Sequence, residues 1–258
     1  MHFARGITTY GDPRNPPIVF LHGIRLGGKI WEEHALALAD EYYVVTPDLP
    51  GHGALVDLPF EPAVIDAFLA HIGTMLSSRP PLVIGYSLGG YVAMRYATAF
   101  PERTCGLLLT GCSTDIVDHR QRLYNFAVAA SGQFPPGMLQ RMLTAFLRLT
   151  CPANVAATII PFRFDHRVFE ASRTIAGGVE YSALLAGYKK PVLLVNGKWD
   201  LLFRRDEAKF ARRAGAPITV MRRGDHIAPL RHPAEFVAIV RSFAYRVFDA
   251  GSTRATGR

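Results

Sequence analysis

A serine in the pattern G-x-S-x-G, at residues 85–89, is the group in this sequence best placed for covalent chemistry. The apolar run 82–84 directly precedes it, and a helix-length segment starts after it. A turn of this kind between a strand and a helix exposes a serine hydroxyl on a tight backbone, and glycines leave room where the chain reverses. We therefore predict that Ser87 is a nucleophile. The alternative is a serine that only caps the helix.

A serine hydroxyl needs a base, because it is a poor nucleophile near neutral pH. His226 is the best candidate among the nine histidines, since the segment 224–229 lies between a strand-like run and the last helix-length segment. Ligands bind at the carboxyl ends of the strands in open α/β sheets, and both Ser87 and His226 would lie at that edge. His232, directly before Pro233, is the rival, and we expect it at the rim.

The histidine in turn needs a carboxylate that orients its ring and stabilises the imidazolium. Asp200 follows the apolar run 192–195, so its loop also opens at the carboxyl edge of the sheet. Asp206, in the next charged segment, and Asp225, beside the histidine, are alternatives for which we expect surface solvation. The prediction is a triad in the chain order Ser87, Asp200, His226.

The negative oxygen that forms during attack on a carbonyl needs hydrogen-bond donors. We assign this role to two backbone N–H groups, those of Leu88, directly after the nucleophile, and of Ile24, in the turn that follows the run 18–21. His22 lies in the same turn and could be mistaken for a base. We expect it to brace the turn by hydrogen bonds instead.

Short apolar runs alternate with helix-length segments along the 258 residues, a pattern typical of a mostly parallel sheet covered on both faces. The expected strands are a strand or hairpin around 3–10 and the runs 18–21, 43–46, 82–85, 106–110, 192–195 and 218–221. The expected helices are 31–41, 62–76, 88–100, 205–215 and 233–248. The prediction is an α/β core made of residues 1–113 and 188–258.

Residues 114–187 contain no strand-like run and are too long for a structureless loop. We expect a helical cap, with short helices near 123–130, 152–160 and 166–176. A further helix is indicated by apolar residues at helical spacing, namely Leu139, Met142, Leu143, Phe146 and Leu147. Phe126, Phe134 and Phe162 add to the apolar content. Met142 and Phe146 are our candidates for substrate contacts, although an apolar stripe of this kind can simply pack the cap onto the core.

The net charge of +8 comes partly from the pairs Arg204-Arg205, Arg212-Arg213 and Arg222-Arg223. No aromatic residues interleave with them, so we expect solvated surface charge and no nucleic-acid partner. The sequence has neither a signal-peptide pattern nor an apolar stretch of about 18 residues, which predicts a cytoplasmic protein without a membrane span. Cys105, Cys112 and Cys151 lack the spacing of a metal site, and we expect reduced, buried thiols.

Taken together, these motifs resemble the α/β-hydrolase superfamily over nearly the whole chain. They are His22-Gly23, the segment 47–53, the serine motif with Gly90, Gly197-Lys198-Trp199-Asp200 and Gly224-Asp225-His226. The resemblance implies an eight-stranded sheet with one antiparallel strand, a helical cap after the sixth strand, and Ser87, Asp200 and His226 as the triad. The segment 47–53 is similar to a structural turn of the family, so we give Asp48 and His52 no catalytic role.

The leading hypothesis is hydrolysis of a small, largely apolar carboxylic ester, thioester or lactone through an acyl-enzyme. Hydrolysis of a carbon–carbon bond and cofactor-free elimination use the same residue types and stay open, as does a receptor with little turnover. The sequence contains no H-E-x-x-H, no nucleotide-binding G-x-x-x-x-G-K-[ST] and no G-x-G-x-x-G after a strand, so we expect no metal and no cofactor. Substrate identity, pathway and oligomeric state are left open.

Overall fold

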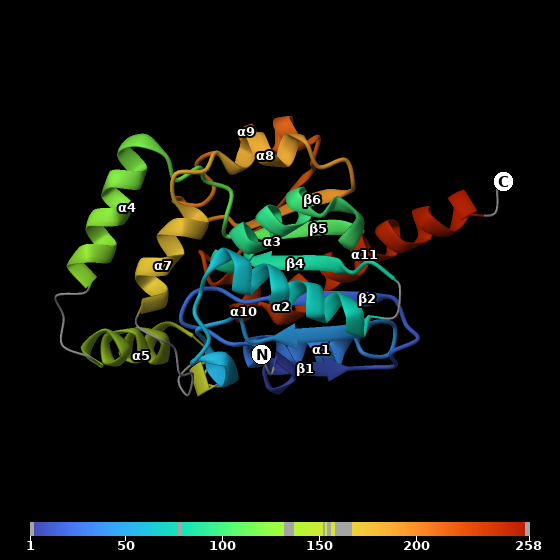
Figure 1. The fold of residues 1–258 in the computed structure, drawn as a ribbon, viewed down its shortest axis with the longest axis horizontal. Helices are drawn as coiled ribbons and strands as arrows, with labels where there is room; N and C mark the ends of the chain where they lie inside the picture. Colours follow the sequence, from blue (N-terminus) through green and yellow to red (C-terminus); the bar gives the residue numbers. More distant parts are fainter. Residues whose placement is uncertain are drawn as a thin grey trace.

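The computed structural model describes residues 3–76, 79–131, 137–151, 153, 156–157 and 167–255. Within these residues the chain forms one seven-stranded sheet in the order β1-β3-β2-β4-β5-β6-β7 (Figure 1). The strands are β1 (Ile7–Tyr10), β2 (Pro17–Leu21), β3 (Tyr43–Pro47), β4 (Leu82–Tyr86), β5 (Gly106–Thr110), β6 (Val192–Gly197) and β7 (Ile218–Met221). Strand β1 pairs with β3 in the antiparallel direction, and every other pairing is parallel.

The six apolar runs predicted as strands are confirmed, and their composition explains why they lie inside the sheet. Strands β2, β4, β5 and β6 are buried along their whole length, so both faces of each strand need apolar side chains. Edge strand β1 is only partly buried. The sheet has one strand fewer than the resemblance implies, because Phe3–Gly6 forms a 3₁₀ helix and β1 is a single strand instead of part of a hairpin.

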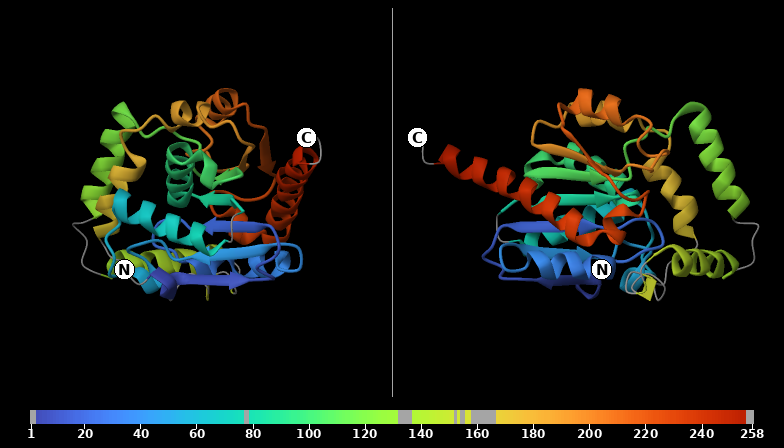
Figure 2. Two further views of the ribbon diagram at one scale, coloured as in Figure 1. Left: turned by 45° about the vertical axis from the view of Figure 1, so that its right-hand side comes forward. Right: turned by 180° about the vertical axis from the view of Figure 1, so that it is seen from behind.

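Helices cover both faces of the sheet (Figure 2). On one face, Val83 and Leu107 belong to a core that includes side chains of α2 (Pro62–Met75), α3 (Leu88–Ala99), α8 (Tyr181–Ala186) and α9 (Glu207–Ala214). On the other face, Leu108 belongs to a core that includes side chains of α1 (Glu32–Leu38), α10 (Ala228–Arg231) and α11 (Pro233–Ala255). Consecutive strand residues face opposite sides, which is why neighbours such as Leu107 and Leu108 belong to different cores. The helices of the core are α1 (Glu32–Leu38), α2 (Pro62–Met75), α3 (Leu88–Ala99), α9 (Glu207–Ala214), α10 (Ala228–Arg231) and α11 (Pro233–Ala255), with 3₁₀ turns at Gly28–Trp31, Gly53–Leu55 and Pro101–Arg103.

The segment between β5 and β6 is helical in its described residues. It contains α4 (Asp118–Ser131), α5 (Met138–Thr150), α7 (Arg167–Ala176) and α8 (Tyr181–Ala186). Helices α4, α5 and α7 lie beyond one end of the strands, opposite the C-terminus, and α7 contacts both α3 and α4 (Figure 1). The helix expected at 152–160 falls mostly outside the described residues, whereas α8 was not predicted.

Two further expectations can be compared with the structure. No helix within the described ranges combines the length and apolar character needed to cross a bilayer. Each of the three cysteines is a thiol, but only Cys112 is fully buried, so the expectation of buried thiols was wrong for half-buried Cys105 and Cys151.

Three buried histidines link the stability of the core to pH. Burial lowers the pKa of His22 and of His34 to about 4 and that of His52 to about 3, and in His52 the neighbouring His22 adds to the effect. The ring of His34 lies against Trp31 and Phe236, and its Nε2–H donates to the carbonyl oxygen of Pro229 at 2.9 Å. These rings are therefore neutral in the folded chain at neutral pH.

We predict that this neutral burial makes the protein less stable in mild acid. An unfolded histidine titrates near pH 6.5, so between about pH 6.5 and 4 the unfolded chain binds protons that the folded chain excludes. The stabilisation is complete above about pH 6.5 and falls as the pH drops, by up to ~1.4 kcal/mol per pH unit for each such histidine. His34→Phe should make the fall in the free energy of unfolding with decreasing pH less steep, by the contribution of about one proton. The measurement is urea unfolding between pH 7.5 and 5.5. His119→Gln, at an exposed side chain, is the control; equal slopes for both variants would contradict the prediction.

Candidate active site

Ser87 lies on a strained turn between β4 and α3. Its φ of 52° is in the left-handed region, where residues other than glycine are rare and often functional. The turn is tight on both sides, because a Cβ atom at Gly85 would lie 2.6 Å from the Cα of Gly90, and one at Gly89 would lie 2.5 Å from the carbonyl oxygen of Leu21. Only glycine fits at Gly85 and Gly89, which explains the spacing of the motif.

The structure brings the three predicted residues of the triad together. The Nε2 atom of His226 lies 3.1 Å from the Oγ of Ser87, and its Nδ1 lies 2.8 Å from the Oδ2 of Asp200. A carboxylate can only accept here, so Nδ1 carries the proton and Nε2 is left to accept from the serine hydroxyl. Asp200 is buried, and its Oδ1 accepts from the backbone N–H of Phe203 at 3.2 Å, which leaves the carboxylate fixed on both oxygens.

The rival carboxylates have other partners. Asp206 forms an ion pair with Arg120 and accepts from the backbone N–H of Asp115 at 3.0 Å. Asp225 forms an ion pair with Arg231 at 3.0 Å instead of contacting the neighbouring histidine. Surface solvation was thus an incomplete prediction: Asp206 joins two distant segments, and Asp225, although partly exposed, pairs within its own segment.

The turn after β2 lies against the serine. A Cβ atom at Gly23 would be 3.2 Å from the Cβ of Ser87, which puts the backbone of this turn beside the nucleophile. His22 is fully buried; its Nε2 accepts from the N–H of Leu49 at 2.8 Å, and its Nδ1–H donates to the carbonyl oxygen of Gly23 at 2.7 Å. The bracing role predicted for His22 is confirmed. Ile24, next in this turn, and Leu88, at the start of α3, are the predicted oxyanion donors, and that role stays a prediction.

Asp48 has the structural role that we expected. Its Oδ1 accepts from the N–H of Gly28 at 2.7 Å and its Oδ2 from the N–H of Ala54 at 2.8 Å. The carboxylate therefore ties two loops together at the same edge of the sheet. His52 is buried nearby with its ring edge towards His22, the two centroids lying 4.9 Å apart.

Sequence reasoning missed the group that supports the histidine. Asn196, at the end of β6, is buried; its Oδ1 accepts from the N–H of Gly111 at 2.7 Å and its Nδ2 donates to Glu207 at 2.7 Å. This side chain holds the end of β5 beside the end of β6. Gly111 has a φ of +64°, and a Cβ atom there would lie 2.7 Å from the Cε1 of His226. A polar residue that ends an apolar strand was the signal available for Asn196.

Aromatic rings hold the histidine on two sides. The ring of Phe203 stacks on His226 with centroids 4.4 Å apart and an angle of 24° between the planes. The buried Tyr86, one residue before the nucleophile, lies 5.2 Å from the same ring. Together with the Asp200 hydrogen bond, these contacts limit the rotation of His226.

The proposed substrate contacts in the inserted segment remain predictions. Met142 lies on α5 with 57% of its surface exposed, so apolar area is available there. Phe146 belongs to the same helix, but its side chain is outside the described part of the structure, as are Phe134 and Phe162 entirely. Among the described residues, no group of three or more His, Cys, Asp or Glu is arranged to hold a metal ion.

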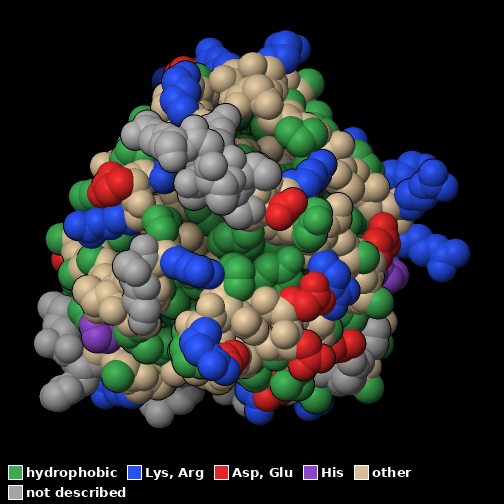
Figure 3. Space-filling model, turned by 90° about the vertical axis from the view of Figure 1, so that its right-hand side faces the viewer, with side chains coloured by type: hydrophobic (Ala, Val, Ile, Leu, Met, Phe, Trp, Pro, Cys, Tyr) green, Lys and Arg blue, Asp and Glu red, His purple; other side chains and the backbone are tan. Residues whose placement is uncertain are grey.

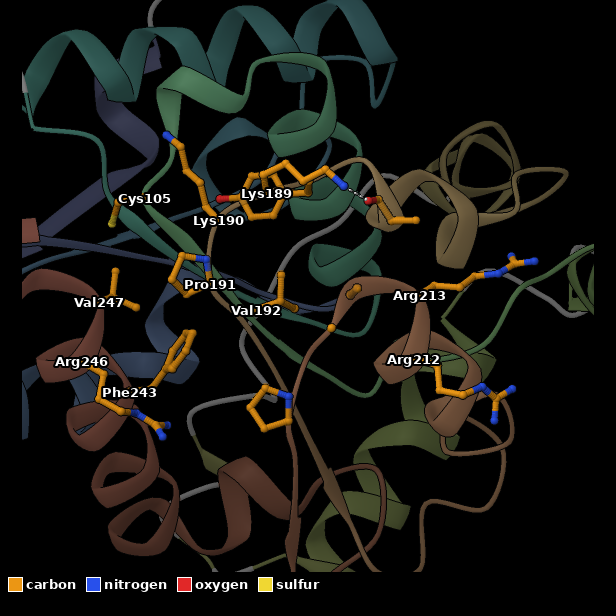
Figure 4. Close-up of a pocket in the computed structure, with 15 residues that line it drawn as sticks. Cys105, Lys189, Lys190, Pro191, Val192, Arg212, Arg213, Phe243, Arg246 and Val247 are labelled. Carbon is orange, nitrogen blue, oxygen red and sulfur yellow. Dashed lines mark hydrogen bonds between the residues drawn. The ribbon is translucent and has the colours of Figure 1, made fainter. Parts of the chain in front are cut away.

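A cavity of about 970 Å³ opens at the opposite edge of the sheet, near the start of β6 and the second half of α11 (Figure 4). Figure 3 shows the molecule from this side, with hydrophobic side chains at the centre and both basic and acidic side chains around them. Lys189 donates to the carbonyl of Ala186 at 2.9 Å, beyond the end of α8, and Arg213 pairs with Glu180 at 2.7 Å. Cations at helix carboxyl ends offset the helix dipole. Burial raises the pKa of Cys105, which lines the cavity, to about 12, so this thiol is protonated at neutral pH.

Comparison with known proteins gives the class of this chain. Residues 18–239 match the model of the "Alpha/beta hydrolase family", and the chain belongs to that family of enzymes. It is 26% identical to the 2-succinyl-6-hydroxy-2,4-cyclohexadiene-1-carboxylate synthase of Serratia proteamaculans, over 93% of this chain and 97% of the relative. It is 25% identical to the pimeloyl-[acyl-carrier protein] methyl ester esterase of Aeromonas hydrophila, over 89% of this chain and 96% of that relative.

The solved structures give the same fold. MenH from S. aureus is similar to this chain with a TM-score of 0.80 and 20% sequence identity, over 94% of this chain and 98% of that one. The α/β-hydrolase fold expected from the motifs is therefore confirmed.

Gly111 provides a test of how the histidine is positioned. We expect Gly111→Ala to slow fluorophosphonate labelling of Ser87 by about a hundredfold, because the added methyl group displaces the ring of His226. Gly215→Ala is the matched control: Gly215 has nearly the same φ, +61°, but nothing lies within 4 Å of its Cβ position. The control variant has the same backbone strain without the steric clash, so its Ser87 should be labelled at the wild-type rate. Equal labelling rates in the two variants would rule out the steric argument.

Proposed function

We propose that this protein is a cofactor-independent serine hydrolase that cleaves a small, largely apolar carboxylic ester, thioester or lactone through an acyl-enzyme. The observation that carries the proposal is the continuous chain of hydrogen bonds from Ser87 through His226 to Asp200. The esterase named among its relatives supports the choice of an ester.

In the first half of the reaction, the Oγ of Ser87 attacks the carbonyl carbon while the Nε2 of His226 takes the hydroxyl proton. The imidazolium is stabilised by the buried carboxylate of Asp200. The backbone N–H groups of Ile24 and Leu88 then donate to the negative oxygen of the tetrahedral intermediate. When the intermediate collapses, the bond to the leaving group breaks and His226 returns the proton to the departing alcohol or thiol.

The second half releases the acid. A water molecule gives a proton to the Nε2 of His226 and attacks the carbonyl carbon of the ester on Ser87. The carbon–Oγ bond breaks, Ser87 recovers the proton, and the carboxylic acid leaves. Because the serine oxygen holds the acyl group between the two steps, one histidine serves as base and acid in turn.

We propose that residues 114–187 form a cap that determines substrate choice. This segment is the large insertion of the fold, and its helices α4, α5 and α7 lie beyond one end of the strands (Figure 1). Ser87 directly follows β4 at the carboxyl edge of the sheet. Its seven Lys and Arg against five Asp and Glu create no strong field for an anionic substrate. A neutral acyl or aryl group fits this composition best.

Elimination is the second candidate, because it uses the same residue types, and a relative that spans nearly the whole chain is named a synthase and not a hydrolase. The same His226 could remove a proton from carbon instead of from Ser87. A chromogenic ester separates the two reactions. An initial burst of released alcohol, equal to the enzyme concentration, requires an acyl-enzyme, and elimination gives none.

The triad is tested by combined substitutions. Ser87→Ala and His226→Ala should each remove nearly all turnover of the ester, and the double variant should be hardly slower, because the two side chains act as a unit. Asp200→Asn should lower kcat by about four orders of magnitude, since the amide favours the wrong histidine tautomer. Asp206→Asn and Asp225→Asn are the controls. Additive losses, or an equal loss in either control, would contradict the assignment.

The role of the cap is tested with esters of different chain length. Met142→Ala or Phe146→Ala should change the relative kcat/KM between short and long esters by about 1–3 kcal/mol for each lost contact. Fluorophosphonate labelling of Ser87 should be unchanged. Met75→Ala, on α2 outside the insertion, is the matched control. If the chain-length profile is the same in all variants, specificity does not come from this face of the cap.

A further inference from the structure

A loop beside the triad exposes three large apolar side chains within four residues. Trp199, Leu201 and Leu202 follow β6 and are 61%, 75% and 63% exposed, whereas Asp200 between them is buried against His226. Neighbouring apolar side chains of this size in water indicate an interaction site more often than isolated ones do. The triad needs only Asp200 and Phe203 from this loop, so it does not explain the other three.

Exposed cations lie in the same loop and in the turn beside it. The loop lies against the turn after β7, since the N–H of Lys198 donates to Met221 at 2.9 Å and that of Trp199 to Gly224 at 3.1 Å. The exposed cations of loop and turn are Lys198, Arg205, Arg222 and Arg223. We call these four residues, together with Trp199, Leu201 and Leu202, the Trp199 patch.

Every carboxylate in this loop and turn is paired. Asp200 bonds to His226, and Asp225 pairs with Arg231. Asp206 pairs with Arg120, and Glu207, at the start of α9, pairs with Arg204. The four exposed cations therefore have no acid of this segment to neutralise them, and the patch carries a net positive charge.

We propose that the Trp199 patch docks the enzyme on an anionic phospholipid surface. Tryptophan and leucine insert at the level of the headgroups, and each Lys or Arg close by is attracted to anionic lipid. A second copy of this chain would bring like charges together. A globular protein partner needs far more area than one turn offers, because stable interfaces bury about 800 Å² on each side.

The position of the patch gives the docking a consequence. Phe203 stacks on the catalytic histidine, and the hydroxyl of Thr114, just before α4, donates to the carbonyl oxygen of Leu202 at 2.7 Å. An enzyme held by this patch would turn the carboxyl edge of its sheet, and the helices beyond it, towards the lipid (Figure 1). This consequence rests on the proposed function, since an apolar ester partitions into the bilayer. The docking itself does not depend on the proposed function.

The chain carries its own reporter for the experiment. Of its two tryptophans, Trp31 is 0% exposed and Trp199 is the exposed one. Vesicles of phosphatidylglycerol and phosphatidylcholine should shift the tryptophan emission of the wild type to shorter wavelength and sediment the protein, whereas vesicles of phosphatidylcholine alone should do neither. Trp199→Phe should still sediment but show no shift.

Two pairs of substitutions locate the effect. Arg222→Glu with Arg223→Glu should lower the partition coefficient by about 25-fold or more, since each cation contributes about fivefold. Arg212→Glu with Arg246→Glu changes the net charge equally but at the opposite edge (Figure 4), and should bind the vesicles much more tightly than the first pair. Leu201→Ser with Leu202→Ser should weaken binding without a change in net charge, and Tyr245→Ser, at an exposed side chain on α11, should not.

The outcomes separate docking from catalysis. Ser87→Ala should lose ester hydrolysis and keep vesicle binding. Absence of binding by the wild type, equal binding to phosphatidylcholine alone, or equal losses in the two charge pairs would overturn the docking proposal and leave the hydrolase proposal intact. Vesicle binding by a wild type that hydrolyses no ester would do the reverse. If the patch instead bound an acidic protein and no vesicle, the docking proposal would equally be wrong.

Discussion

The hydrogen bond between His226 and Asp200 is the interaction on which the site depends. A neutral imidazole has one donor and one acceptor nitrogen, so fixing the proton on Nδ1 leaves Nε2 free to accept from Ser87. To keep these two atoms 2.8 Å apart, the relative position of the loops after β6 and β7 must be fixed to within a fraction of an ångström. Much of the local structure meets this requirement.

Close backbone approaches keep these loops together. A Cβ atom at Gly197 would lie 2.3 Å from the carbonyl oxygen of Asp225, so the loops that carry Asp200 and His226 touch through their backbones. Asn196 adds the end of β5 to the same assembly. These contacts fix the ends of neighbouring strands relative to one another. The sheet therefore holds Ser87, Asp200 and His226 in place although they are distant in the sequence.

The inserted segment is fixed to the core at both of its ends. Asp115, near its start, is buried and accepts from the N–H and the hydroxyl of Ser182, near its end, while Lys209 of α9 pairs with the same carboxylate at 2.8 Å. Arg120 pairs with Asp206 of the loop before α9. These anchors use side chains other than Ser87, Asp200 and His226, so the attachment of the segment and the candidate triad depend on different contacts.

The sequence by itself determined the strands and the turn that carries Ser87, and its motifs predicted a triad in the order Ser87, Asp200, His226. These features depend on local spacing: apolar runs, glycines where a Cβ atom would clash, and polar residues directly after a strand. It did not reveal the roles of Asn196 and Gly111 or the pairing of Asp206 with Arg120, because these depend on contacts between segments far apart in the chain. The tertiary structure alone decided which carboxylate meets His226 and which apolar residues stay in water. Only packing brings the three loops to one edge of the sheet, and only packing leaves Trp199, Leu201 and Leu202 outside the core.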